Sequence, residues 1–188
     1  MRTLLITILL IGGAVTAGLI RESIESIDRS PELSQLLLPF REAALLARPP
    51  DTTILVPLAA MRTRSIADTW HAPRAPGRQH EGQDLFARRG TPVYSATSGI
   101  VARIGNAGIG GNAVSIIGAG GRVYYYAHLS RFGYLRVGDE VTRDTVIGYV
   151  GNTGNAVSTP PHLHFGVYDR GRPINPLPLL VDRQSYAG

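Results

Sequence analysis

His162 and His164 stand on alternate positions of the stretch 160–165, whose other members are proline, leucine and phenylalanine. If this stretch forms a strand, the two imidazoles point to one face and the intervening apolar side chains to the other. Two imidazoles on one face can share one site. His80 and Asp84, four positions apart, offer a further imidazole and a carboxylate. Two histidines and one carboxylate form the ligand set of a catalytic zinc site, which leaves a coordination position open for water.

Tyr124, Tyr126 and His128 alternate along a second run of strand character, so alternation predicts that they share one face. A free imidazole that faces the same cleft as a metal can donate a hydrogen bond to a developing oxyanion or move a proton. A single histidine on a strand is more often structural. The neighbouring stretches of sequence therefore decide between a catalytic and a packing role for His128.

The elements that must hold these side chains begin after Pro49 and Pro50, where the composition changes. Seven short β-rich runs follow, separated by clusters of glycine, asparagine and aspartate: 53–56, 93–96, 99–104, 113–117, 122–128, 146–150 and 162–168. Strands this short and this evenly spaced indicate an antiparallel sheet or sandwich rather than βαβ units. The sequence predicts a mainly β catalytic domain over residues 51–180, with residues 181–188 as a tail.

Residues 1–20 are apolar from Leu4 onward apart from two threonines. We interpret them as an export segment, either a cleaved signal peptide or a retained membrane anchor, since 17 residues lie at the lower edge for crossing a bilayer. The protein is then expected in the periplasm or cell envelope, and in the inner membrane if the segment is retained. A buried core helix is the less favoured alternative, because the extreme amino-terminal position suits targeting better.

Residues 21–50 carry apolar side chains at spacings of three and four, which is typical of a helix. Ser30 can cap such a helix and Pro31 suits its first position, whereas Pro39 should kink or divide it. No residue of this segment is suited to chemistry. We interpret it as a helical spacer ahead of the catalytic domain.

The chain has a formal net charge of +5, and all 19 of its basic residues are arginine. Arginine binds carboxylates and phosphates through a bidentate fork, so an acidic polymer or an anionic membrane surface is a plausible neighbour. The scattered arginines are equally consistent with an ordinary surface. The sequence contains no basic run with interleaved aromatic residues, so nucleic-acid binding is not predicted. Because cysteine is absent, any metal must bind to histidine and carboxylate.

Three motifs follow one another along the chain, with five short glycine-containing stretches among them. The motifs are His80-x-x-x-Asp84, Tyr126-Ala127-His128-Leu129-Ser130 and His162-Leu163-His164-Phe165, and the stretches are 90–96, 111–114, 137–141, 147–148 and 151–154. Over roughly residues 70–176, their order and spacing resemble those of the lysostaphin or LytM-type zinc endopeptidases of bacterial cell walls. The resemblance implies an antiparallel, sandwich-like β domain of the LytM type (a duplicated hybrid motif), with Zn²⁺ in a groove on its face.

By this resemblance the zinc ligands are expected at His80, Asp84 and His164, and two further catalytic histidines at His128 and His162. A zinc-activated water would then attack a peptide carbonyl, while the two free imidazoles stabilise the oxyanion and help move the proton to the leaving amine. The remaining histidine, at position 71, is expected at the groove or on the surface, with metal ligation as a lesser alternative.

Three more residues are assigned to the substrate groove: Tyr126, Asn112 and Arg74. Tyr126 could steer substrate or simply pack, and Asn112 could order a loop beside the groove. Arg74 could meet substrate carboxylates or remain a solvated surface charge. The sequence departs from the commonest family pattern at Gly166, where many members carry glutamate, and at Gln83, where an apolar residue often precedes the ligand aspartate.

These features predict an exported zinc metalloendopeptidase that hydrolyses peptide bonds in the stems or cross-links of peptidoglycan. Two alternatives stay open. One is a non-catalytic module of the same fold that binds cell wall or activates another protein, and the other is a zinc carboxypeptidase or amidase on the same polymer. A purely structural sandwich with incidental histidines would bind no stoichiometric metal.

Overall fold

The computed structural model describes residues 31–74 and 77–183 of the chain. The chain divides into two compact units, residues 1–41 and 42–188. The predicted signal peptide or anchor at residues 1–20 lies outside the described residues. In the part of the chain that is described, no helix has both the length and the apolar character needed to cross a membrane.

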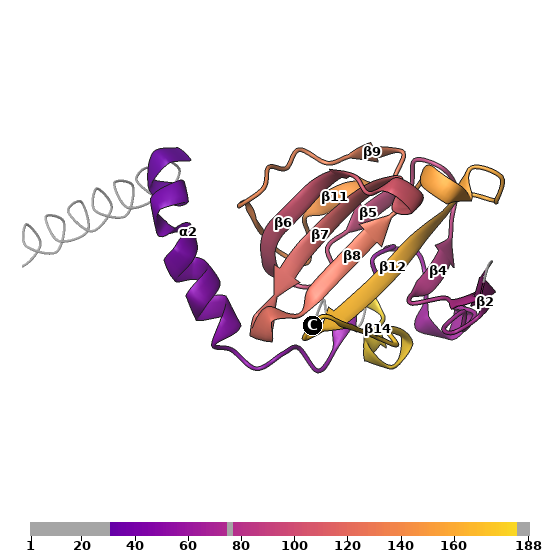
Figure 1. Ribbon diagram of the computed structural model, residues 1–188, viewed down its shortest axis with the longest axis horizontal. Coiled ribbons are helices and arrows are strands. Elements are labelled where there is room, and N and C mark those ends of the chain that lie inside the picture. Colours follow the sequence, from indigo (N-terminus) through magenta and orange to yellow (C-terminus); the bar gives the residue numbers. More distant parts are fainter. Residues whose placement is uncertain (1–30, 75–76, 184–188) are drawn as a thin grey trace, which may run out of the picture. The chain divides into compact units, whose positions relative to one another are not determined.

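Helix α2 (Pro31–Leu46) confirms the predicted helix over part of the segment 21–50 (Figure 1). The helix begins at Pro31, and proline suits a first position because the N–H that it lacks would have no intrahelical partner there. Pro39 lies inside the helix, which continues past it to Leu46 as one element. Of the two effects expected of Pro39, a kink or a division, the division does not occur.

The larger unit contains a seven-stranded antiparallel sheet with the strand order β10-β6-β7-β8-β12-β13, and β4 also pairs with β12 (Figure 1). Its strands are β4 (Gln83–Phe86), β6 (Gly99–Asn106), β7 (Asn112–Gly118), β8 (Val123–Ala127), β10 (Glu140–Val141), β12 (His162–Asp169) and β13 (Arg172–Ile174). A second, three-stranded sheet has the order β5-β11-β9. Its strands are β5 (Pro92–Tyr94), β9 (Arg131–Phe132) and β11 (Val146–Tyr149).

Two short pairs complete the strands. The hairpin β2 (Pro73–Arg74) and β3 (Arg78–Gln79) is antiparallel, whereas β1 (Ile54–Leu55) and β14 (Leu180–Val181) pair in parallel. Single turns of 3₁₀ helix lie at η1 (Thr63–Ser65), η2 (Gly108–Gly110), η3 (Ala119–Gly121), η4 (Gly154–Ala156) and η5 (Leu177–Leu179). The seven predicted strands are all present, and the antiparallel, sandwich-like fold is confirmed. The short strand β4, which carries Asp84, was not predicted.

The hydrophobic core lies between the two sheets. From β12 it takes Leu163, Phe165 and Val167, which are fully buried because alternate residues of a strand face one side. Val93 of β5 and Ile147 of β11 are equally buried and belong to the same cluster. One face of β12 is therefore committed to the core, and its other face carries the polar residues of the site.

Strand β12 is the element that brings distant parts of the sequence together. It pairs with β8 along one edge and with β4 and β13 along the other. In this register His164 lies opposite Asp84 of β4 and opposite Ala127 of β8. The carboxylate and the imidazole, 80 positions apart in sequence, thus become cross-strand neighbours on one face.

Candidate metal centre

Three side chains converge beside β12, each offering one metal-binding atom: His80, Asp84 and His164. Nε2 of His80 lies 2.8 Å from Nδ1 of His164 and 3.0 Å from Oδ1 of Asp84. Nδ1 of His164 lies 3.2 Å from the same carboxylate oxygen. Ligand atoms about 2.0–2.1 Å from a tetrahedral zinc ion would lie roughly 3.3 Å from one another. The three donors therefore fit one zinc-sized cation with small adjustments.

Each ligand atom is presented in a usable state. Nδ1 of His80 lies 2.7 Å from the backbone oxygen of Thr69. Because a carbonyl can only accept a hydrogen bond, Nδ1 carries the proton and Nε2 keeps its lone pair for a metal. Burial lowers the pKa of His164 and so favours its neutral imidazole. Metal binding requires such deprotonated ligands.

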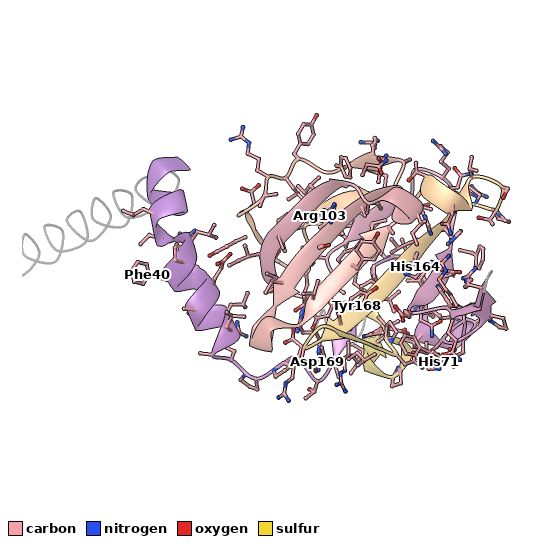
Figure 2. The ribbon with its side chains drawn as sticks, in the orientation of Figure 1. Phe40, His71, Arg103, His164, Tyr168 and Asp169 are labelled. Atoms are coloured by element: carbon pink, nitrogen blue, oxygen red, sulfur yellow. The ribbon has the colours of Figure 1, made fainter. Side chains whose placement is uncertain are left out.

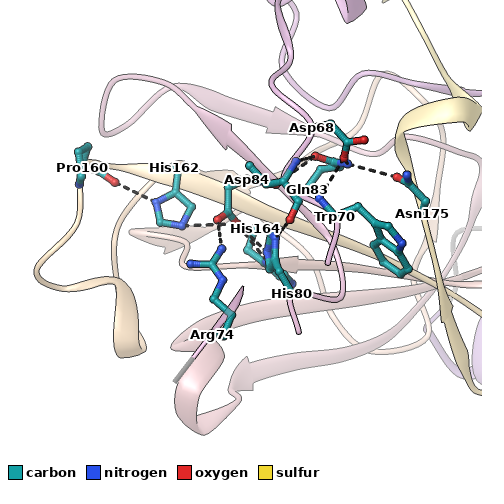
Figure 3. Close-up of polar contacts among 11 residues, drawn as sticks. Asp68, Trp70, Arg74, His80, Gln83, Asp84, Pro160, His162, His164 and Asn175 are labelled. Carbon is teal, nitrogen blue, oxygen red and sulfur yellow. Dashed lines mark hydrogen bonds and ion pairs between the residues drawn. The ribbon is translucent and has the colours of Figure 1, made fainter. Parts of the chain in front are cut away.

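Asp84 is charged despite being 6% exposed. Burial by itself would raise the pKa of its carboxyl group, but the close contacts with His164 and His80 outweigh that effect and hold the pKa well below its usual range. Oδ2, the oxygen that faces away from the two histidines, accepts a hydrogen bond from Nη2 of Arg74 (Figure 3). One oxygen of Asp84 thus faces the metal-binding atoms while the other is held by a guanidinium.

Glycine at position 82 is required by the close approach of β12. A Cβ built on Gly82 would lie 2.6 Å from Cε1 of His164 and 2.8 Å from the backbone oxygen of Phe165. Such contacts are far shorter than carbon atoms allow. The loop between His80 and Asp84 can therefore lie against the His164 ring only because residue 82 has no side chain.

Two more imidazoles, those of His128 and His162, lie next to the three ligands. Their rings have centroids 5.0 Å apart, and the His128 ring lies 5.8 Å from that of His164. Nδ1 of His128 donates to the backbone oxygen of Thr153 at 2.9 Å. Nδ1 of His162 likewise donates to the backbone oxygen of Pro160 at 2.9 Å. Both rings therefore have an unprotonated Nε2 when neutral, and that of His162 lies 3.8 Å from Oδ1 of Asp84.

His128 reaches the groove by a backbone conformation that the sequence did not reveal. Alternation from Tyr126 would place it in the core, but its φ of 62° takes the chain out of the extended conformation immediately after β8. Its side chain then lines the groove. Burial lowers the pKa of His128 to about 4, and the nearby His164 adds to the effect, so the imidazole is neutral at pH 7.

Of the two roles expected for Tyr126, steering substrate or packing, the structure shows packing, and Tyr126 does not line the groove. Tyr126 is fully buried, its ring packs 5.1 Å from that of Phe165, and its hydroxyl accepts a hydrogen bond from the backbone N–H of Ala96. The register pairs Tyr125 with Gly166, on the face that carries His164, so Tyr125 is the tyrosine of β8 that lines the groove. The prediction that Tyr126 and His128 share a face is wrong, because the extended strand ends at residue 127.

The groove around these residues has a volume of about 450 Å³. Tyr125, His164 and Tyr168 contribute to it from the outer face of the seven-stranded sheet. Figure 2 shows His164 and Tyr168 on this face. Arg74 and Arg78, which lie directly opposite each other on the β2–β3 hairpin, supply a cationic side to the groove. The Arg74 side chain is 43% exposed, so part of its guanidinium remains accessible to a molecule in the groove.

Asn112 and His71 do not line the groove. The backbone N–H of Asn112 donates to Oγ1 of Thr153, and its carbonyl accepts from the N–H of Leu129. Asn112 thus helps order the loop at Thr153, which in turn accepts the hydrogen bond of His128. This agrees with the expectation that Asn112 orders a loop beside the groove. His71 is exposed and stacks on Trp70 with ring centroids 4.5 Å apart.

Comparison with known proteins identifies the family. A model described as peptidase family M23 matches residues 78–176, which include all five site residues of the sequence motifs. This chain belongs to peptidase family M23. The matched M23 segment begins within the β2–β3 hairpin and ends just after β13, so it contains all seven strands of the larger sheet.

Other M23 proteins share both sequence and fold with this chain. A DD-carboxypeptidase/endopeptidase, Mpg, of Neisseria meningitidis serogroup B is 40% identical over 120 residues, covering 64% of this chain and 25% of that protein. The catalytic domain of lysostaphin from Staphylococcus simulans aligns with a TM-score of 0.54 and 32% identity, covering 62% of this chain and 92% of that domain. A zinc-containing peptidase from Vibrio cholerae aligns with a TM-score of 0.56 and 30% identity over 68% and 39% of the two chains.

These similarities confirm the resemblance to lysostaphin-type peptidases that the motifs indicated. The chain spans only about a quarter of the length of the Neisseria protein. The similarity therefore concerns the M23 domain. Sequence reasoning missed Tyr125, Thr69 and the polar contacts of Gln83, none of which belongs to a motif; the one signal was the unusual residue type at position 83.

Proposed function

We propose that this chain is an exported zinc metallopeptidase that hydrolyses peptide bonds in the stems or cross-links of peptidoglycan. The observation that carries the proposal is the convergence of one donor atom each from His80, Asp84 and His164, with Nε2 of His128 and His162 beside them. The zinc-containing Vibrio relative and the activities for which the Neisseria protein is named support the metal and the reaction class.

Zinc held by these three residues would supply a Lewis acid and would lower the pKa of a bound water to about 7. Hydrolysis requires that the attacking water lose a proton and that the leaving amine gain one. His128 and His162 are suited to this transfer, because a neutral ring with its proton fixed on Nδ1 accepts a proton at Nε2. The resulting imidazolium can donate a hydrogen bond to the oxyanion or the proton to the amine.

Arg74 is proposed to bind carboxylates of the substrate. It lines the groove beside the ligand cluster, and arginine binds carboxylates through paired N–H groups. The export assignment rests on the apolar residues 1–20 and remains a proposal together with the cell-envelope location.

A DD-carboxypeptidase activity on the same polymer is a second candidate, because the name of the Neisseria relative includes it. The two reactions use the same zinc chemistry and differ in the bond that is cut. A module that binds cell wall without cutting it would have no need of the complete set of ligands and free imidazoles.

The test uses the full chain, purified in detergent, with defined muropeptides as substrate. We expect about one zinc per chain and peptide products whose masses identify the bond cleaved; chelator and His164→Ala should abolish both metal uptake and cleavage. His71→Ala is the matched control, since it removes an exposed histidine outside the groove. Wild-type protein without stoichiometric zinc, or cleavage that survives His164→Ala, would overturn the proposal.

A further inference from the structure

Gln83 is a fully buried polar side chain one residue before Asp84, and alternation along β4 points it away from the groove. Its Oε1 accepts hydrogen bonds from the backbone N–H and from Oγ1 of Thr69, at 2.9 and 3.0 Å. Its Nε2 donates to Oδ1 of Asp68 at 2.8 Å and to Oδ1 of Asn175 at 3.2 Å (Figure 3). A primary amide has two donors and two acceptor positions, so Gln83 uses its whole capacity.

Thr69, which Gln83 holds at two atoms, contacts both ligands that come from this part of the chain. The backbone oxygen of Thr69 accepts the hydrogen bond from Nδ1 of His80. Oγ1 of Thr69 accepts a hydrogen bond from the backbone N–H of Asp84 at 3.0 Å. The position of one threonine thus determines the tautomer and orientation of His80 and anchors the backbone of Asp84.

We propose that Gln83 is a positioning residue of the metal centre, which acts through Thr69 to fix the His80 ring for metal binding. The inference deepens the proposed function and rests on it only in assuming that the three-ligand site takes up zinc. Hydrogen-bond partners of metal-binding histidines commonly tune metal affinity by about 10-fold to 100-fold. Gln83 stands one step further out, since it touches neither ligand ring.

The four hydrogen bonds of the Gln83 amide do more than allow a side chain to fill this part of the core. An apolar side chain at position 83 would avoid the cost of burying an amide, which is offset only when all of its hydrogen bonds are made. Here the amide joins three separate segments: β4, the loop at residues 68–69 and the residue after β13. Oδ1 of Asn175 also accepts the N–H of Leu177, so this third anchor is itself fixed.

The experiment measures zinc affinity by competition with a chromophoric chelator, on the full chain, for wild type, Gln83→Met and Thr69→Val. Gln83→Met keeps the size of the side chain and removes all four hydrogen bonds. Thr69→Val keeps the carbonyl that faces His80 but removes both contacts of Oγ1. We expect each variant to bind zinc about 10-fold more weakly than wild type. Cross-peaks of the His80 ring nitrogens in the NMR spectrum of metal-free protein should show a second tautomer in Gln83→Met.

Tyr126→Phe serves as the matched control, because it also removes a buried side-chain hydrogen bond, here to the N–H of Ala96 in the core. It should lower the melting temperature and leave zinc affinity unchanged. If Gln83→Met lowers the melting temperature in the same way while its zinc affinity stays within about twofold of wild type, Gln83 is structural only and the inference fails.

A second variant decides the matter if Gln83→Met does not fold. Gln83→Glu retains an oxygen that can accept from Thr69 but cannot donate to Asp68 or Asn175. Its zinc affinity should therefore lie between those of wild type and Thr69→Val, and wild-type affinity in both Gln83→Glu and Thr69→Val would overturn the inference. If wild-type protein itself takes up no zinc, the proposed function fails; if wild type binds zinc and cleaves while the variants match it, only the positioning role fails.

Discussion

His128 adopts a left-handed backbone conformation, with φ of 62°, that L-residues other than asparagine, aspartate and histidine rarely occupy. Its side chain is held there by the hydrogen bond from Nδ1 to the oxygen of Thr153, and its N–H donates to the oxygen of Gly110. Strained residues that the surrounding structure fixes in this way are common at functional sites. This backbone conformation directs the imidazole of His128 into the groove instead of the core.

Replacing His128 by asparagine separates its chemistry from its backbone conformation, because asparagine tolerates the left-handed region. We expect kcat/KM on a muropeptide to fall by about 100-fold or more, with zinc content unchanged, since His128 is not among the three ligands. Metal analysis and product formation on one preparation check both parts. Loss of zinc from His128→Asn would show instead that this residue supports metal binding.

The stability of the metal-free protein should depend on the titration of His128. Its pKa is lowered from 6.5 to about 4, chiefly by burial, so between these pH values the unfolded chain binds a proton that the folded chain does not. The contribution is complete above pH 6.5 and is lost as the pH falls toward 4. The free energy of unfolding should decrease over this range by at most about 3 kcal/mol. Urea unfolding at several pH values measures this decrease. In His128→Asn the free energy of unfolding should change less between pH 6.5 and 4.

The pairing of β4 with β12 decides the geometry of the site at the scale of elements. β12 places His162 and His164 on one face, but the carboxylate reaches them only because β4 lies beside it in a register that aligns Asp84 with His164. Slipping this pairing by one residue would turn Asp84 to the other face and bring Gln83 toward the groove. Leu85, fully buried in the core, favours the observed register.

The approach of β4 to β12 can be tested at Gly82. Gly82→Ala would place a methyl group 2.6 Å from Cε1 of His164, so either the ring or the loop must move. We expect zinc affinity to fall by about 10-fold or more, as measured by chelator competition. Gly166→Ala is the control on β12, where the added Cβ would lie 3.2 Å from the end of the Tyr168 ring. Similar zinc affinities for the two variants would contradict this account.

At the scale of the whole molecule, the site depends on a core that lies beneath it. His162 and His164 alternate with Leu163 and Phe165, so the strand that presents the imidazoles is fixed by burial of its opposite face. The core contains side chains from both sheets, and close packing limits how far β12 can shift. The packing of the two sheets therefore holds the metal-binding atoms of the site in place.

Phe165→Ala tests this dependence. Removal of a fully buried phenylalanine should lower the free energy of unfolding by about 3–5 kcal/mol, because a cavity remains next to Tyr126. Denaturant unfolding of the zinc-free chain measures the change. Phe86→Ala, at a side chain that is 52% exposed, should cost about 1 kcal/mol or less. Equal losses in the two variants would show that the core beneath the site contributes little.

The sequence by itself determined the donor types, the lack of cysteine, the alternation of His162 with His164, and the positions of seven strands. These features are local, because residue type and a period of two survive any tertiary arrangement. Only the tertiary structure decided that Tyr125 faces the groove and Tyr126 the core, that Asp84 pairs with His164, and that Gln83 holds the His80 support in place. Each of these depends on a strand partner, a turn conformation or a contact between residues far apart in sequence, and no local pattern records them.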